Sequence, residues 1–201
     1  TPAVDWSDAW DYFALAEITD GLFIMGYDYH WSGSSYAGPV SPLGGFAYDL
    51  EFTINDYISK TGNNVEKLIL GLPYYGYDWL VLSSQIYSQT TGTATARIYS
   101  IADPLAQNYG HNWAENSNSP WFSYEDGGWR QCWYDDSLSL SIKYEFAVAN
   151  NLAGVGMWAL GYDQGTMTLW NALENIFMGC NSDGDVNFDT VVNIQDIIHI
   201  V

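Results

Sequence analysis

Positive charge is scarce in this 201-residue chain, which has five lysine and arginine residues against 24 aspartate and glutamate residues. The formal net charge is −19. A surface of this sign repels polyanions, so we expect no nucleic-acid partner and no binding to acidic membrane surfaces. The sequence also lacks any run of about 18 apolar residues, so no transmembrane segment is predicted.

Cysteine is equally rare. Cys132 and Cys180 could form one disulfide in an exported protein or remain two buried thiols, and we favour the disulfide. Charged residues make up only 14% of the chain, whereas tryptophan, tyrosine and phenylalanine make up 17%. This balance favours a packed globule over an acidic disordered tail. Aromatic rings also suit sugar binding, because the C–H faces of pyranose rings lie flat on them; an aromatic core is the simpler alternative.

Three short apolar runs are typical of buried parallel strands, and they occupy residues 21–28 (GLFIMGYD), 67–75 (KLILGLPYY) and 154–160 (GVGMWAL). Between and after them, apolar residues recur with helical spacing. The first apolar stripe is Leu50, Ile54, Tyr57 and Ile58, and the last is Leu169, Ala172, Leu173 and Ile176. The middle stripe is Leu138, Ile142, Phe146 and Ala149, and Asp136 and Ser137 are candidate N-caps of its helix. This alternation predicts an α/β fold.

The second and third strand runs are separated by a long stretch, about residues 79–133, rich in small polar and aromatic residues. Its β-prone pieces at 96–101 and 121–124 predict a small sheet-containing insertion. We expect it at the carboxyl ends of the strands, where α/β barrels place their active sites. Three or four parallel strands cannot close a barrel, so we expect the chain to be part of a longer polypeptide.

The ends of the three runs resemble those of family 18 glycoside hydrolases, the chitinase family. DGLFIMGYDYHW resembles the Met-x-Tyr-Asp motif of the sixth barrel strand, KLILGLPYYGYDW the seventh strand and GVGMWALGYD the eighth. Residues 2–4 then end the fifth strand. The resemblance covers about residues 2–177. It implies the C-terminal half of a (β/α)8 TIM barrel at 1–178, with a small α+β insertion between the seventh and eighth strands.

The resemblance implies hydrolysis of β-1,4-linked N-acetylglucosamine polymers, either chitin or peptidoglycan, by a substrate-assisted retaining mechanism without a cofactor. It assigns Tyr27 as donor to the substrate acetamido oxygen, and Asp28 as a neighbour that helps to set the pKa of the general acid. Met25, Tyr75 and Trp158 are assigned to substrate binding. From the residues alone, Met25 and Trp158 also fit core positions, and the Tyr27–Asp28 pair fits a buried tyrosine with a capping aspartate.

The sequence departs from the family in one respect that concerns catalysis directly. The Asp-x-x-Asp-x-Asp-x-Glu motif that carries the general acid does not occur; Asp5, Asp8 and Asp11 have another spacing and are expected to open a helix. We therefore expect the full-length protein to be the glycosidase and this segment alone to be inactive. Tyr77 stands where many chitinases carry arginine. The alternative is a chitin-binding lectin of the same fold that has lost the acid.

Residues 185–196 (DVNFDTVVNIQD) have oxygen-bearing side chains at the spacing of a calcium-binding loop. They resemble the first half of a dockerin repeat, joined by a linker at 179–184 to the preceding domain and running to 201. The resemblance implies a cohesin or cell-surface anchor as partner and a secreted or cell-surface protein. The alternatives are an acidic linker with an apolar end, or a calcium-dependent scaffold or adhesion protein. The calcium ligands would be Asp185, Asn187, Asp189, Asn193 and Asp196, with the carbonyl of Val191.

Overall fold

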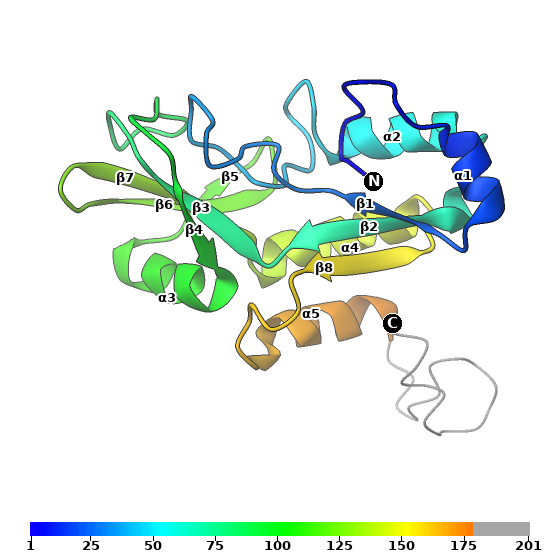
Figure 1. Ribbon diagram of the computed structural model, residues 1–201. Helices are drawn as coiled ribbons and strands as arrows, with labels where there is room; N and C mark the ends of the chain where they lie inside the picture. The colour runs from blue at the N-terminus through cyan, green and yellow to red at the C-terminus, as the bar shows by residue number, and fades with distance from the viewer. Residues whose placement is uncertain (179–201) are drawn as a thin grey trace.

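The structure is a computed structural model that describes residues 1–178. The three apolar runs form one parallel sheet, as Figure 1 shows. Pro2 adds a single parallel bridge to Met25 beside the first strand. The α/β fold predicted from the sequence is confirmed. The strands lie in the order β1 (Leu22–Met25), β2 (Leu68–Pro73) and β8 (Gly154–Trp158).

Aspartate caps begin three of the helices. Asp11, Asp49 and Asp136 each accept a hydrogen bond from the backbone N–H three residues later. Such bonds satisfy amide groups that the first helical turn leaves unpaired. Of the two caps predicted for the helix near 137, Asp136 is the one used. The helices of the α/β unit are α1 (Tyr12–Ile18), α2 (Leu50–Lys60), the short 3-10 turn η1 (Val65–Lys67), α4 (Ser137–Ala149) and α5 (Met167–Phe177).

The predicted apolar stripe of α4 covers only part of its buried face. Ile142 and Phe146 pack against the core as predicted, but Leu138 is 55% exposed, whereas Leu140 and Tyr144 are buried. Lys143 lies on the same buried face and its ammonium group contacts the buried carboxylate of Asp135. The apolar periodicity was misleading because a lysine and a tyrosine with polar partners occupy core positions that hydrophobicity alone assigns to solvent.

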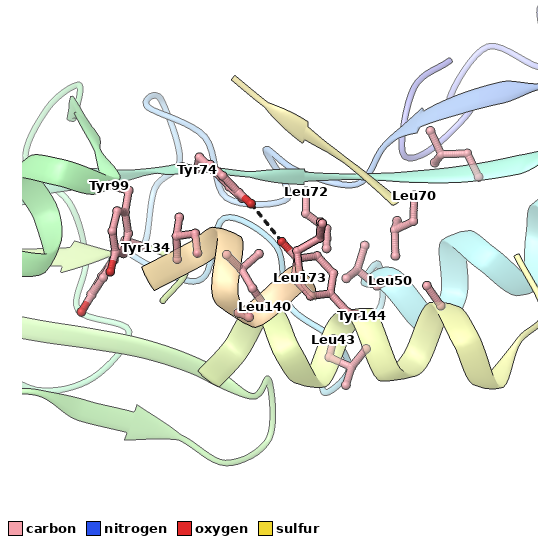
Figure 2. Packing of buried hydrophobic residues seen from close by; sticks show 14 of the residues in the cluster. Leu43, Leu50, Leu70, Leu72, Tyr74, Tyr99, Tyr134, Leu140, Tyr144 and Leu173 are labelled. Atoms are coloured by element: carbon pink, nitrogen blue, oxygen red, sulfur yellow. Dashed lines mark hydrogen bonds between the residues drawn. The ribbon is translucent and has the colours of Figure 1, made fainter. Parts of the chain in front are cut away.

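The main core lies between the parallel sheet and α2, α4 and α5. Figure 2 shows leucines of the strands and helices packed with several tyrosines. The hydroxyl groups of Tyr74 and Tyr144 lie 3.1 Å apart, so two large side chains from distant segments share a buried hydrogen bond. Buried tyrosines of this kind combine apolar packing with a satisfied polar end.

A second, antiparallel sheet lies off the carboxyl ends of the parallel strands (Figure 1). Strand β3 follows β2 with only Tyr74 between them, so this sheet begins before residue 79. The piece expected to be extended over 96–101 is a strand only to Ile98, because a helix begins at Tyr99. The elements are β3 (Tyr75–Leu80), β4 (Thr95–Ile98), α3 (Tyr99–Tyr109), β5 (Asn112–Ala114), β6 (Ser119–Glu125) and β7 (Trp129–Trp133), with the strand order β4-β3-β7-β6-β5.

A fully buried carboxylate, Asp78 on β3, connects four strands of this sheet. It accepts hydrogen bonds from Arg97 Nη2 on β4 at 2.9 Å, from Arg130 Nε on β7 at 3.0 Å and from the Tyr124 hydroxyl on β6 at 2.8 Å. Removing a carboxylate from water is costly, and paired guanidinium groups with good hydrogen-bond geometry offset that cost. Asp78 therefore links β3, β4, β6 and β7 through side chains as well as backbone.

The buried pair of Lys143 and Asp135 leads to a stability prediction. Replacing Lys143 with Met leaves the Asp135 carboxylate buried without its counter-ion, and we expect a loss of about 3–5 kcal/mol in the free energy of unfolding, measured by urea denaturation. The matched control is Lys60→Met, since Lys60 pairs with Asp56 near the surface and its loss should cost below about 0.5 kcal/mol. Equal effects of the two substitutions would contradict the assignment. Adding Asp135→Asn to Lys143→Met should restore part of the loss.

Candidate active site

The chain leaves the parallel sheet in a tight turn directly after β1. Gly26 has no room for a side chain, because a Cβ there would meet Leu50, Leu70 and the carbonyl of Gly71 at 2.8 Å. Asp28 then adopts a left-handed backbone conformation with φ of 63°. Aspartate is among the residues that tolerate this region, and such conformations concentrate at functional sites. The turn places Tyr27 and Asp28 at the carboxyl end of the strand.

Two phenols from β3 bind the Asp28 carboxylate. The Tyr75 hydroxyl donates to Asp28 Oδ1 at 2.5 Å, and the Tyr77 hydroxyl donates to the same oxygen at 3.2 Å. The Tyr27 ring lies edge-on to Tyr75, with ring centroids 6.2 Å apart. The structure therefore brings three of the predicted site residues together and adds Tyr77 to them.

The phenols of this cluster resist ionisation. Burial and the nearby charge of Asp28 raise the pKa of Tyr27, and the same causes raise the pKa of Tyr75 well above its usual value. They raise the pKa of Tyr77 to about 12. Desolvation and a neighbouring negative charge both disfavour a phenolate. Tyr27 therefore remains a neutral O–H donor across the physiological range.

Met25, Tyr27, Asp28, Tyr75 and Trp158 line one hollow of about 390 Å³. Trp158 is 53% exposed and Met25 39% exposed, so neither is a core residue. The hollow is large enough for a sugar ring and its substituents. All five residues predicted for catalysis and substrate binding thus meet at one opening; their individual roles remain predictions.

A second hollow of about 380 Å³ adjoins the first, with Met25, Tyr27 and Asp28 in the shared wall. Trp6, Trp31 and Tyr48 add aromatic surface to it, and the rings of Trp6 and Tyr48 lie 4.5 Å apart. The two hollows together form an aromatic groove on both sides of the Tyr27–Asp28 turn.

Sequence reasoning gave no site role to several residues of this groove, among them Tyr77, which it named only as a departure from the family. Tyr77 could have been found, because it lies two positions after Tyr75 and side chains at that spacing face the same side of a strand. Tyr162 also lines the first hollow, and Trp6 and Tyr48 line the second. These three come from loops and a helix cap region whose positions no local sequence pattern predicts.

Gly156 on β8 leaves room for an aromatic ring from another strand. A Cβ at Gly156 would collide with the ring of Phe23 on β1. The same ring lies over Gly71 on the middle strand. The glycines of β2 and β8 therefore accommodate an aromatic side chain from β1, because neighbouring strands place these positions beside one another.

Several predictions fall outside the described residues. The calcium ligands at 185–196, the linker at 179–184 and Cys180 all lie there. Cys132 is buried in β7, and its pairing with Cys180 stays a prediction. In residues 1–178 no group of three or more His, Cys, Asp or Glu side chains could hold a metal ion. None of the helices in that part of the chain has the length and apolarity that a membrane crossing needs.

Comparison with known proteins adds independent information. A family model described as glycosyl hydrolases family 18 matches residues 1–163. Human di-N-acetylchitobiase is 29% identical over 195 residues, covering 82% of this chain and 49% of the relative. The cortical fragment-lytic enzyme of Bacillus subtilis is 30% identical over 167 residues, covering 78% of this chain and 35% of the relative.

Among solved structures, the Group IV chitinase of Ostrinia furnacalis in complex with allosamidin matches with a TM-score of 0.77 at 20% identity. The match covers 89% of this chain and 56% of that one, and it supports the fold. The chain thus spans about a third to a half of the length of the curated relatives it matches.

The Asp28 cluster predicts an alkaline titration. Replacing Asp28 with Asn removes a negative charge, so we expect the phenols of Tyr27, Tyr75 and Tyr77 to ionise at lower pH, with Tyr77 falling from about 12 toward the ordinary value of about 10. Difference absorbance at 295 nm between variant and parent measures this shift. The control is Glu66→Gln, an exposed carboxylate in η1. Superimposable titrations of Asp28→Asn and the parent would show that Asp28 does not influence these phenols.

The same pKa shift has a consequence for stability. Because the folded-state pKa of Tyr77 lies above its unfolded value of about 10, the neutral phenol stabilises the folded chain fully below pH 10. That contribution is lost as the pH rises from about 10 to about 12. The unfolding midpoint of Tyr77→Phe should therefore depend less steeply on pH in this range than that of the parent.

Proposed function

We propose, since this chain belongs to glycosyl hydrolase family 18, that the full-length protein hydrolyses β-1,4-linked N-acetylglucosamine polymers by a substrate-assisted retaining mechanism. One observation carries the proposal. A neutral phenol, a carboxylate and an exposed indole, from Tyr27, Asp28 and Trp158, line a single hollow of sugar size. The names of the relatives, a chitobiase and a cortex-lytic enzyme, agree with this substrate class.

Tyr27 holds the substrate acetamido group in the proposed reaction. The acetamido oxygen attacks the anomeric carbon while the C–O bond to the leaving sugar breaks, and the general acid gives its proton to the leaving oxygen. Water then adds to the anomeric carbon and opens the cyclic intermediate, returning a proton to the same carboxylate. The Tyr27 hydroxyl donates to the acetamido group as the cyclic intermediate forms, and its raised pKa keeps the proton available. A donor fixed before the reaction stabilises developing charge without reorganisation.

Asp28 and Trp158 position the sugar. Oδ1 of Asp28 already accepts hydrogen bonds from two phenols, so Oδ2 is the oxygen left for the substrate and the general acid. Trp158 provides the floor, because the apolar face of a pyranose ring stacks on an exposed indole. Met25 and Tyr75 complete the walls.

In family 18 the general acid is a glutamate at the end of the fourth barrel strand, and we place its counterpart in a part of the protein outside this sequence. We propose that residues 1–178 are the C-terminal half of a (β/α)8 barrel, with the antiparallel sheet as an insertion between its seventh and eighth strands. The order β1-β2-β8, the bridge from Pro2 to Met25 and the greater length of the relatives support this arrangement. The segment alone should then be inactive.

The last residues add a proposed anchoring function. The spacing of oxygen side chains over 185–196 supports a calcium-binding repeat of the dockerin type, which pairs with a cohesin or another cell-surface anchor. A secreted or cell-surface location follows, because chitin and peptidoglycan lie outside the cytoplasm.

The test of the proposed function is the release of sugar from chitooligosaccharides by the full-length protein. Tyr27→Phe removes the hydroxyl donor and leaves the ring, so we expect turnover to fall roughly 10- to 10³-fold with a smaller change in KM. The matched control is Tyr36→Phe, because Tyr36 is 56% exposed and lines neither hollow.

Two results would count against the proposal. Unchanged turnover of Tyr27→Phe would remove Tyr27 from the mechanism. Binding of the oligosaccharide by the parent protein, without any release of product, would indicate a lectin of the same fold instead.

The second hollow predicts a preference for longer chains. Trp31→Ala removes an exposed ring from that hollow, so we expect kcat/KM for a tetrasaccharide to fall about 10-fold or more while that for a disaccharide analogue changes little. Parallel kinetics on both substrates measure the difference. An equal loss on both would indicate that Trp31 supports the fold of the site and does not bind a further sugar.

A further inference from the structure

Every lysine and arginine in the sequence is engaged away from the groove. Lys60 pairs with Asp56 on α2, and the Lys67 ammonium donates to the carbonyl of Thr19. Arg97 and Arg130 both bind Asp78, and Lys143 binds Asp135 in the core. Within residues 1–178, no basic side chain lines either hollow.

The geometry of the antiparallel sheet keeps the nearest cation out of the groove. Tyr75 pairs with Ile98 and Tyr77 with Ala96 across β3 and β4, and all four line the first hollow. Arg97 lies between Ala96 and Ile98, so its side chain points to the opposite face, where it meets Asp78. A basic residue one position from the lining thus contributes no positive charge to it.

His30, the histidine that follows the Tyr27–Asp28 turn, does not supply a positive charge in place of lysine or arginine. Burial lowers the pKa of His30 below its usual value, so the imidazole is neutral near pH 7. Its Nδ1 lies 2.9 Å from the carbonyl oxygen of Pro39, which holds the ring in place. The charged side chain that lines both hollows is the carboxylate of Asp28.

We propose that this half of the groove selects its glycan by charge. It accepts neutral and amine-bearing chains of N-acetylglucosamine and disfavours chains that carry carboxylate groups. The inference rests on the proposed function and bears on the two polymers that share its chemistry. Chitin, including partly deacetylated chitin, fits the groove, whereas peptidoglycan strands whose lactyl groups are free carboxylates do not. The overall negative charge of the chain acts in the same direction at long range.

Coulomb's law sets the size of the effect. Two unit charges about 8 Å apart change affinity roughly 2- to 30-fold, between the screening of bulk water and that of a protein surface. A substrate carboxylate near Asp28 should therefore lower kcat/KM by that factor, and a substrate ammonium group should not. Because the interaction is electrostatic, the difference should shrink as ionic strength rises from 0.01 to 0.5 M.

The experiment uses the full-length protein and matched substrates. The first pair is a peptide-free glycan strand with lactyl carboxylates and the same strand with those groups converted to amides. We expect kcat/KM to be about 2- to 30-fold higher for the amide, with a ratio that falls toward one in high salt. Neutral and partly deacetylated chitooligosaccharides form the second pair, and we expect the deacetylated one to be cleaved at least as well at low salt.

A charge variant tests the groove directly. Ala96 is exposed and lines the first hollow, so Ala96→Lys places an ammonium group beside the substrate and should reduce the preference for the amide strand several-fold. The control is Leu82→Lys, which adds the same charge at a side chain 64% exposed and outside both hollows. It should leave the preference unchanged.

The outcomes separate the two proposals. Cleavage of the carboxylate and amide strands at equal rates, beside normal cleavage of neutral chitooligosaccharides, would overturn the charge selection and leave the proposed function standing. A preference that Leu82→Lys removes as well as Ala96→Lys would locate the effect in overall charge and overturn the assignment to the groove. No cleavage of any of these substrates would overturn the proposed function, and the inference with it.

Discussion

The candidate site depends on Tyr74, the one residue that joins β2 of the parallel sheet to β3 of the antiparallel sheet. Its backbone N–H donates to the carbonyl of Trp158 at 2.8 Å, and its carbonyl accepts from the N–H of Tyr99, also at 2.8 Å. Its hydroxyl lies 3.1 Å from that of Tyr144, as Figure 2 shows. The end of β8, the start of α3 and the middle of α4 are thus all tied to one residue. The next residue, Tyr75, is thereby held where its hydroxyl reaches Asp28.

The small number of basic residues affects both the stability of the fold and the charge of the site. The chain has few cations, and three of them compensate the buried carboxylates of Asp78 and Asp135. These pairs organise the antiparallel sheet and the core around α4, because a buried carboxylate without a partner is strongly destabilising. What remains for the groove is a neutral aromatic lining around Asp28. The buried ion pairs and the lack of positive charge in the groove therefore both follow from how few basic residues the chain has.

The groove combines a rigid base with exposed rings. Tyr75, Asp28 and Tyr77 are joined by hydrogen bonds, and the left-handed conformation at Asp28 directs its carboxylate toward both phenols. Trp158, Met25 and Trp31 remain substantially exposed, although burying such large apolar side chains would stabilise the folded protein. Exposed apolar surface at a hollow is typical of a binding site, because a bound ligand removes that surface from water and the hydrophobic free energy then favours binding.

Local patterns in the sequence were enough to predict the strands of the parallel sheet, the helices α2, α4 and α5 and the cap at Asp136. The order of three family motifs also pointed to Met25, Tyr27, Asp28, Tyr75 and Trp158 as residues of one site. These features depend on residues a few positions apart, whose spacing reflects strand and helix geometry directly. The buried face of α4, the position of the Phe23 ring over Gly156 and the positions of Trp6 and Tyr48 in the groove were decided only by the tertiary structure. Each depends on contacts between segments far apart in the chain, which no local periodicity encodes.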